Sequence, residues 1–307
     1  MRRRLFSICL ALGAMALAGG AWMASAQWAT SAEVTVGALA GQTHFHGIAV
    51  DARDPSRLYL ATHHGLFAVG PDGSAERISE SRDDFMGFTP HPRDPATLYA
   101  SGHPAGGGNL GFIGSSDGGR TWRRLSDGVG GPVDFHQMDV SKADPEIIYG
   151  VHHGLQKSAD AGRSWRRVAP APQGLIGLAA SSRDVDTLFA ATRQGLWRST
   201  DGGRSWRAAH PARRAASMVH VTAAGDVYAF VAGTGLIRAS EPAPTLGQEL
   251  RWQVLNTGFG SDYILHFAVA SRDPRRLYAV TLNPETHAQA VLASRDSGAR
   301  WSKLGQE

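Results

Sequence analysis

The chain has 307 residues, of which 42% are hydrophobic and 19% are charged. This composition is typical of a globular protein with a buried core and excludes a disordered or fibrous chain. The single cysteine, Cys9, excludes a disulfide scaffold, a cysteine-based zinc site and an iron–sulfur centre.

Residues 1–26 have the three parts of a secretory signal peptide. Residues 2–4 are all arginine, residues 5–20 are mostly apolar, and Ala24-Ser25-Ala26 is a small-residue cleavage site. We expect export by the general secretory route, to the periplasm or out of the cell. A twin-arginine signal, which Arg3-Arg4 would suit, and an uncleaved membrane anchor are the alternatives.

Cleavage after Ala26 would change both the charge and the thiol content. It removes three arginines and no acidic residue, so the formal net charge falls from +4 to +1, and it also removes Cys9. A thiol-free chain suits an oxidising compartment. The rest of the chain has no basic stripe interleaved with aromatic residues. We therefore expect no nucleic-acid partner and, in the mature chain, no membrane span.

From residue 46 onward a turn followed by a short strand recurs about every 40–50 residues. Its clear copies begin with Asp-Pro, while residues 184–189 are a variant and residues 225–228 a shortened copy. No segment after the signal peptide keeps a helical period, and short apolar runs alternate with the turns. We predict six blades of a single β-propeller over residues 46–307, with four antiparallel strands each, starting near residues 46, 86, 136, 176, 218 and 265.

Residues 27–45 form an N-terminal segment before the first blade. Within it, residues 33–39 resemble a strand in their apolar pattern. This stretch predicts either an additional closing strand or part of a seventh, incomplete blade.

Four of the repeats contain a hairpin with the shared pattern S-x-D-x-G-x-[ST]-W, in which Arg300 replaces the hydroxyl residue of the last copy. An aspartate in such a turn accepts backbone N–H bonds, glycine permits a positive φ, and tryptophan packs between sheets. These aspartates and tryptophans are therefore predicted to be structural rather than catalytic. They are Asp117, Trp122, Asp160, Trp165, Asp201, Trp206, Asp296 and Trp301.

The four hairpins resemble the Asp-box repeat of bacterial neuraminidases, and the resemblance covers nearly the whole mature chain. Propellers with such repeats include sialidases, sortilin-type receptors, xyloglucan-degrading glycosidases and photosystem II assembly factors. The resemblance therefore implies the fold, whereas the function has to be argued from the site.

Propeller geometry places the Asp-Pro turns and the four hairpins on one face. The opposite face carries the starts of the inner strands and the turns between second and third strands, around the central channel. When the repeats are aligned on the Asp-Pro turn, most of the thirteen histidines fall into columns on that opposite face. The columns hold His44, Asp84, Asp134 and Tyr263; His46, Met86 and His136; and His63, His103, His153 and Arg193, with His64 and His152 beside them.

A ring of histidine, methionine and aspartate side chains indicates a transition-metal site. Histidine with methionine suits copper, and histidine with aspartate suits zinc, manganese or non-haem iron. The alternative is that duplication of the repeat copied these histidines, which then only make hydrogen bonds between blades. The candidate ligands are His44, His46, His63, His64, Met86, His136 and His152.

The resemblance to sialidases implies a second candidate chemistry. Tyr263 would be the nucleophile and Asp84 or Asp134 the acid, with substrate bound by Arg193, His103 and His153. The Arg-Ile-Pro sequence that opens those enzymes is absent, and no glutamate stands where it would partner Tyr263.

We predict an exported binding protein whose face opposite the hairpins takes a metal ion, copper or zinc, or a small molecule or glycan. A sialidase-like glycoside hydrolase is the first alternative. A non-enzymatic assembly or recognition propeller with a protein partner is the second.

Overall fold

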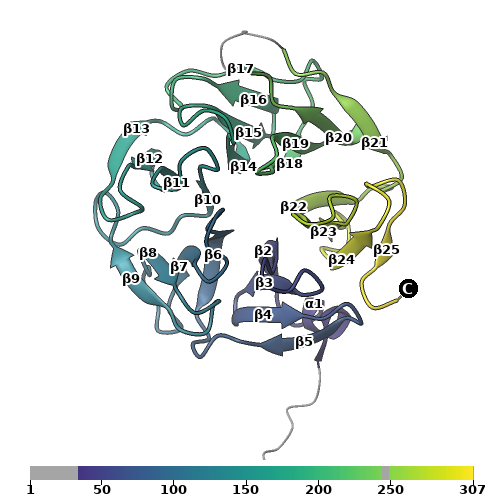
Figure 1. Ribbon diagram of the computed structural model, residues 1–307, viewed down its shortest axis with the longest axis horizontal. Coiled ribbons are helices and arrows are strands. Elements are labelled where there is room, and N and C mark those ends of the chain that lie inside the picture. Colours follow the sequence, from purple (N-terminus) through teal and green to yellow (C-terminus); the bar gives the residue numbers. More distant parts are fainter. Residues whose placement is uncertain (1–33, 244–248, 307) are drawn as a thin grey trace, which may run out of the picture. The chain divides into compact units, whose positions relative to one another are not determined.

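The computed structural model describes residues 34–243 and 249–306, and the expected signal peptide lies outside them. The described residues form six antiparallel sheets arranged as the blades of a β-propeller (Figure 1). The prediction of a six-bladed propeller is confirmed, and the alternative of a seventh blade is wrong.

In every blade the strands follow one another outward from the centre of the ring (Figure 1). The first three blades are β2 (Phe45–Val50), β3 (Leu58–Thr62), β4 (Gly65–Val69) and β5 (Ser74–Arg77); β6 (Asp84–Pro90), β7 (Leu98–His103), β8 (Phe112–Ser115) and β9 (Arg123–Ser126); and β10 (Gln137–Val140), β11 (Ile148–Val151), β12 (Leu155–Ser158) and β13 (Arg166–Ala169).

The other three blades have the same order. They are β14 (Leu175–Ala180), β15 (Leu188–Thr192), β16 (Gly195–Ser199) and β17 (Arg207–Ala208); β18 (Ala216–Val221), β19 (Asp226–Val231), β20 (Gly235–Ser240) and β21 (Gln253–Asn256); and β22 (Tyr263–Val269), β23 (Leu277–Leu282), β24 (Gln289–Ser294) and β25 (Ser302–Lys303). Each inner strand contacts the inner strands of both neighbouring blades, and β2 contacts β22, so the ring closes.

The N-terminal segment takes a different form from the strand expected at residues 33–39. Only β1 (Val34–Thr35) is extended, and it pairs with β5 at the outer edge of blade 1. The helix α1 (Val36–Ala40) follows, because the Thr35 side chain caps it by accepting a hydrogen bond from the backbone N–H of Ala38. No described helix is long and apolar enough to cross a membrane.

The blades pack face to face through apolar side chains. The second strands β3 and β15 are buried along their whole length because blades cover both of their faces, whereas the outer strands β9 and β13 are half exposed. The ring of Trp165 contacts Phe112 of blade 2 and Phe135 of blade 3, with centroids 5.2 and 4.8 Å away. The hairpin tryptophan thus fills the space between two blades, as its size predicts.

In all four hairpins the aspartate accepts hydrogen bonds from the serine hydroxyl two residues earlier and from the backbone N–H four residues later. The Asp117 carboxylate accepts bonds from the backbone N–H groups of Arg120 and Thr121, each at 3.0 Å, and from the hydroxyls of Ser115 and Thr121. A Cβ on Gly119 would lie 2.3 Å from Leu66 of the preceding blade, so this turn needs glycine for its close approach as well as for its positive φ of 91°. These aspartates therefore hold turns together.

Candidate functional site

The face opposite the four hairpins collects side chains from the inner-strand starts and from the turns between second and third strands. His46 lies in β2, Asp84 begins β6, and His63 lies in the β3–β4 turn. His103 ends β7, and Asp134 and His136 precede β10. The fold brings these six residues together as two groups, each with three possible metal ligands.

The first group, site I, consists of His46, His63 and Asp84. The Nε2 atom of His46 lies 3.2 Å from both ring nitrogens of His63 and 3.6 Å from Oδ1 of Asp84. Nδ1 of His63 lies 2.8 Å from Oδ2 of Asp84. One ligand atom from each residue lies within 4.8 Å of the others, which is close enough for a single ion to bind all three.

The electrostatics of site I favour a neutral imidazole beside a carboxylate. Burial lowers the pKa of His46 to about 4; Asp84 opposes this shift, and the neighbouring His63, His266 and His44 add to it. His46 is therefore ready to ligate at neutral pH without first losing a proton. Oδ1 of Asp84 is buried and accepts no hydrogen bond, and a cation would compensate for that missing partner.

The second group, site II, consists of His103, Asp134 and His136. Oδ2 of Asp134 lies 3.1 Å from Nε2 of His103 and 2.6 Å from Nε2 of His136. Oδ1 of Asp134 is buried without a hydrogen-bond partner, as in site I. Nδ1 of His103 lies 2.8 Å from the carbonyl oxygen of Gly108, so donation there leaves Nε2 of a neutral ring facing the carboxylate with its lone pair. A cation between these two acceptors would satisfy both.

Protonation competes with metal binding more strongly in site II. Burial would raise the pKa of Asp134, but the hydrogen bond from His136 and the favourable electrostatic interactions with His136, His103 and His152 outweigh it and lower that pKa. The same hydrogen bond raises the pKa of His136 above its ordinary value. Asp84 also contributes to the shift of His136, so the two sites are close enough to interact electrostatically.

Two of the three ligands in sites I and II follow one rule of the repeat. In each, the histidine at the end of a second strand meets the aspartate that begins the inner strand of the next blade: His63 meets Asp84, and His103 meets Asp134. The third ligand departs from this rule: His46 lies in the inner strand of the blade that supplies His63, whereas His136 precedes the inner strand of the blade that supplies Asp134. In the next blade Gly174 stands at the position of the aspartate, so the series ends there.

Several other predicted ligands lie next to the two sites. The ring of His63 is 5.5 Å from that of His44 and 6.5 Å from that of His64, so both border site I. Nδ1 of His152 lies 3.1 Å from the backbone oxygen of Asp134, and the His152 and His153 rings contact each other at 4.2 Å. Met86 is buried in β6, where it pairs with Ser101.

Of the residues predicted for a glycosidase, His103 lies beside Asp134 in site II, whereas Tyr263 and Arg193 do not join either aspartate in a described group. The ring of Tyr263 contacts that of Phe230 at 6.2 Å, and no described interaction joins Tyr263 to Asp84 or Asp134. Arg193 is exposed in the β15–β16 turn, where its backbone N–H donates to Gly174. Each aspartate is instead enclosed by imidazoles.

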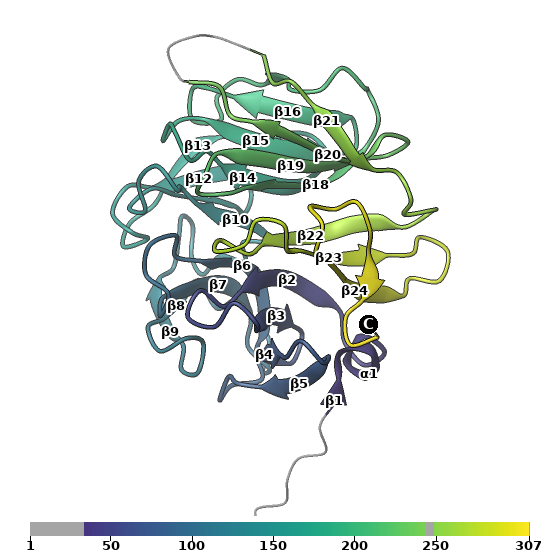
Figure 2. The same ribbon diagram turned by 45° about the vertical axis from the view of Figure 1, so that its right-hand side comes forward.

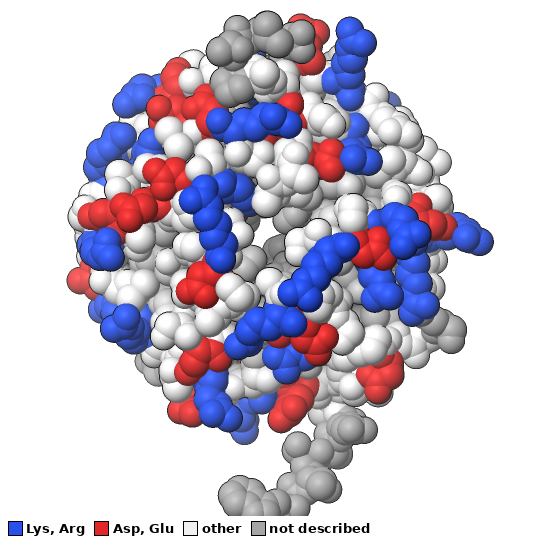
Figure 3. All heavy atoms as spheres, in the orientation of Figure 1, with Lys and Arg blue, Asp and Glu red and all other residues white. Residues whose placement is uncertain are grey.

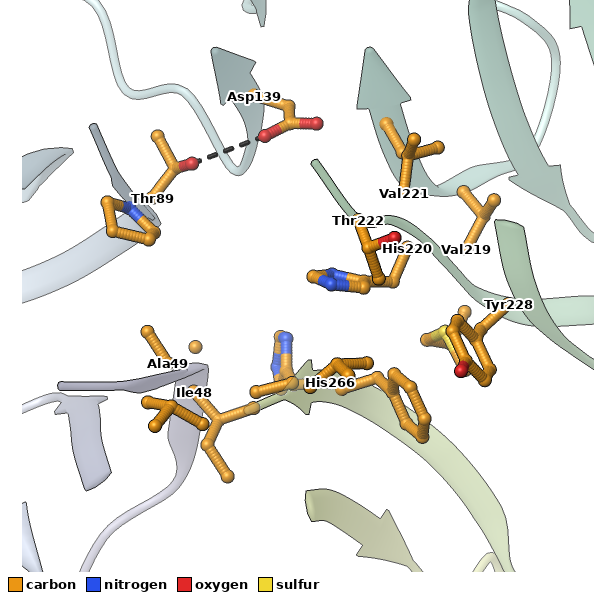
Figure 4. A pocket seen from close by; sticks show the side chains of 18 of the residues that line it. Ile48, Ala49, Thr89, Asp139, Val219, His220, Val221, Thr222, Tyr228 and His266 are labelled. Carbon is orange, nitrogen blue, oxygen red and sulfur yellow. Dashed lines mark hydrogen bonds between the residues drawn. The ribbon is translucent and has the colours of Figure 1, made fainter. Parts of the chain in front are cut away.

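A cavity of about 510 Å³ runs through the centre of the ring and is lined by all six inner strands. His220 of β18 and His266 of β22 point into it (Figure 4). The sequence columns do not place these two among the candidate ligands, although His266 follows the column position Leu265 and His220 lies two residues after Met218 in an inner strand. Their shared position on inner strands is the signal that could have identified them.

No protein-family model and no curated protein matches this sequence. Among solved structures, a xyloglucanase from Xanthomonas campestris matches with a TM-score of 0.56 and 19% identity over 88% of this chain; the match spans 46% of the xyloglucanase. A gluconolactonase from Xanthomonas campestris matches with a TM-score of 0.56 and 14% identity, over 80% of this chain and 84% of its own. YCF48 from Cyanidioschyzon merolae matches with a TM-score of 0.49 and 18% identity, over 85% and 84%. At these identities the likeness concerns the fold alone.

Proposed function

We propose that this protein is a metal-binding propeller that holds a divalent transition-metal ion in site I and a second in site II. The observation that supports this function best is the pair of His₂Asp groups, each with one buried carboxylate oxygen that lacks a hydrogen-bond partner. Duplication explains why histidines recur in the repeat. It does not explain why two buried carboxylates leave an oxygen unpaired, which costs free energy unless a cation is bound.

The donor set favours zinc over copper. Each site offers two imidazole nitrogens and one carboxylate oxygen, a combination that suits zinc, manganese or non-haem iron. Three protein ligands leave at least one coordination position for water or for a bound molecule. We therefore assign the protein a binding role in which an exposed metal ion takes up a ligand from solution.

Zinc titration of the metal-free protein by isothermal calorimetry tests this proposal. We expect two ions per chain for the wild type and one for Asp84→Asn or Asp134→Asn, with at least about a 100-fold loss of affinity at the altered site, since even outer residues of metal sites contribute 10–100-fold. Asp127→Asn, which changes an exposed carboxylate paired with Arg124, is the matched control and should bind two ions. A wild-type chain without zinc binding, or stoichiometry unchanged in both site variants, would contradict the proposal.

We also propose that the protein works outside the cytoplasm, after removal of residues 1–26. The support is the order of arginines, apolar stretch and Ala-Ser-Ala site in the sequence. An exported chain without thiols would meet metal ions through imidazole and carboxylate ligands alone.

A further inference from the structure

The central cavity is separate in chemistry from the two metal sites. Its wall consists largely of apolar side chains of the inner strands, among them Ile48, Met138 and Val219. Its volume of about 510 Å³ lies within the range of roughly 300–1,000 Å³ that is usual for small-molecule sites. His46 and His136 line one end of it, so the cavity opens beside sites I and II.

The charged side chains of the cavity wall already form ion pairs, either with one another or with a neighbouring residue. Lys142 forms an ion pair with Asp139, which also accepts hydrogen bonds from Thr89 and from the backbone N–H of Ala180 (Figure 4). Arg238 binds Asp226 at 2.9 Å on the wall of blade 5.

The remaining charged side chain of the cavity wall is Arg275, whose Nε lies 3.0 Å from Oδ1 of Asp273. Around the opening of the ring, basic side chains lie beside acidic ones (Figure 3). A charged ligand inside the cavity would therefore find no free counter-ion in the described wall, and burial of an unpaired charge is costly.

Two imidazoles are the polar groups within the apolar region of the cavity wall. His220 and His266 point toward the cavity from adjacent inner strands (Figure 4). Burial lowers the pKa of His220 to about 3 and that of His266 to about 4, which favours the neutral form of both rings. A neutral ring has one donor and one acceptor, which suits an uncharged partner; His266 already forms a hydrogen bond with the backbone of Phe45, so its other ring nitrogen is the one available to a ligand. Neither ring belongs to a group of three metal ligands among the described residues.

We propose that the central cavity is a second binding site, which takes an uncharged small molecule with an apolar body and a hydrogen-bonding group that meets His220 or His266. The apolar wall provides the affinity, and the two imidazoles orient the ligand. Ligand binding here needs no metal ion, because the imidazoles of sites I and II lie only at the end of the cavity.

A pair of fluorescent probes tests the proposal on the mature protein in EDTA. N-phenyl-1-naphthylamine is uncharged and has one N–H donor, and 8-anilino-1-naphthalenesulfonate adds a negative charge to the same ring system. We expect the neutral probe to bind with increased fluorescence and at least about tenfold more tightly than the anion, because desolvation of the sulfonate is uncompensated. Equal binding of both probes, or none of the neutral one, would overturn the proposal.

Three variants locate the probe. Leu265→Trp narrows the cavity at a partly exposed lining residue and should weaken the neutral probe at least about tenfold, while Val254→Trp adds the same ring at an exposed position of β21 and should change nothing. The double variant His220→Phe with His266→Phe keeps an aromatic ring at each position but removes the ring nitrogens, and it should weaken binding of the neutral probe about tenfold through the lost hydrogen bond.

Circular dichroism checks that each variant folds. If Leu265→Trp fails to fold, the double phenylalanine variant carries the test. Probe affinity unchanged in the folded variants would place the probe elsewhere and refute the cavity site. Zinc stoichiometry should remain at two ions in all three variants, so a failure here is distinguishable from a failure of sites I and II.

Discussion

Asp84 and Asp134 are the residues of the candidate sites whose hydrogen bonding is incomplete. Each has a side chain that is mostly buried, with one oxygen within hydrogen-bonding distance of an imidazole and the other without a hydrogen-bond partner. An unsatisfied buried polar atom costs about 1–3 kcal/mol, and more when it is charged. Metal binding would recover this cost, so stability and zinc binding should be coupled.

The first prediction concerns this coupling. Zinc at 100 times its dissociation constant should stabilise the wild type by about 2.7 kcal/mol per site, seen as a rise in melting temperature that EDTA reverses. The double variant Asp84→Asn with Asp134→Asn should show no rise. An equal rise in both proteins, measured by differential scanning calorimetry, would mean that zinc binds elsewhere.

The second prediction concerns the hairpin aspartates. Partial burial would raise the pKa of Asp117, but hydrogen bonds from Thr121, Ser115 and Arg120 outweigh it and lower the pKa to about 2. A lowered carboxyl pKa stabilises the fold above the ordinary value of 3.8, and this stabilisation is lost as the pH falls toward 2. At pH 7, Asp117→Asn should therefore have a lower melting temperature than the wild type, because it loses about 1 kcal/mol of hydrogen-bond free energy.

The pH dependence distinguishes this effect from general damage. The difference in melting temperature between Asp117→Asn and the wild type should become smaller as the pH falls from about 4 to 2, because the wild-type carboxylate becomes protonated there. Glu146→Gln, at an exposed position in an Asp-Pro turn, should follow the wild type throughout. Thermal melts at pH 7, 4 and 3 make the comparison, and a constant gap would contradict the mechanism.

At the scale of elements, α1 strengthens the closure of the ring. Val36 and Leu39 are buried in the cluster that also contains Leu304 and Val291 of the last blade. The helix contacts β24 and lies beside the C-terminal end of the described chain (Figure 2). The first and last blades share no strand, so this apolar contact and the contact of β2 with β22 hold them together.

The third prediction follows from that contact. Leu39→Ala should destabilise the protein by about 2 kcal/mol, the lower end of the range for a buried leucine, and lower the melting temperature by roughly 4–8 °C. Amide exchange in β24 and β25 should rise more than in blade 3, because the loss is local. Ala38→Ser, at an exposed position of the same helix, is the control. Uniform exchange across the blades would show that α1 does not support the closure.

At the scale of the whole molecule, every proposed site depends on the ring. Sites I and II combine residues of neighbouring blades, and the cavity is bounded by all six inner strands. A single blade would therefore hold neither a complete metal site nor the cavity.

The fourth prediction concerns the exported form. If residues 1–26 are a cleaved signal, the protein recovered from an extracytoplasmic fraction begins at Gln27. Intact-mass spectrometry of that fraction measures this directly, and Ala26→Leu should slow processing, because cleavage needs a small residue. A chain recovered outside the cytoplasm with Met1 still attached would indicate an uncleaved anchor instead.

Much of the fold could be predicted from local patterns. Blade number and strand starts followed from the Asp-Pro turns, and the predicted blade starts lie within about two residues of the observed inner strands. The segment at residues 33–39 was predicted less well. A strand pattern and a short amphipathic helix look alike over so few residues, and the tertiary contact of Val36 and Leu39 decided between them.

The candidate sites divide in the same way. The sequence by itself determined which residues share the face opposite the hairpins, because repeat phase fixes the level of each side chain in its blade. It could not determine that His63 meets Asp84 and His103 meets Asp134, nor that His220 and His266 share a cavity. Those outcomes depend on contacts between blades far apart in sequence, which only the closed ring creates.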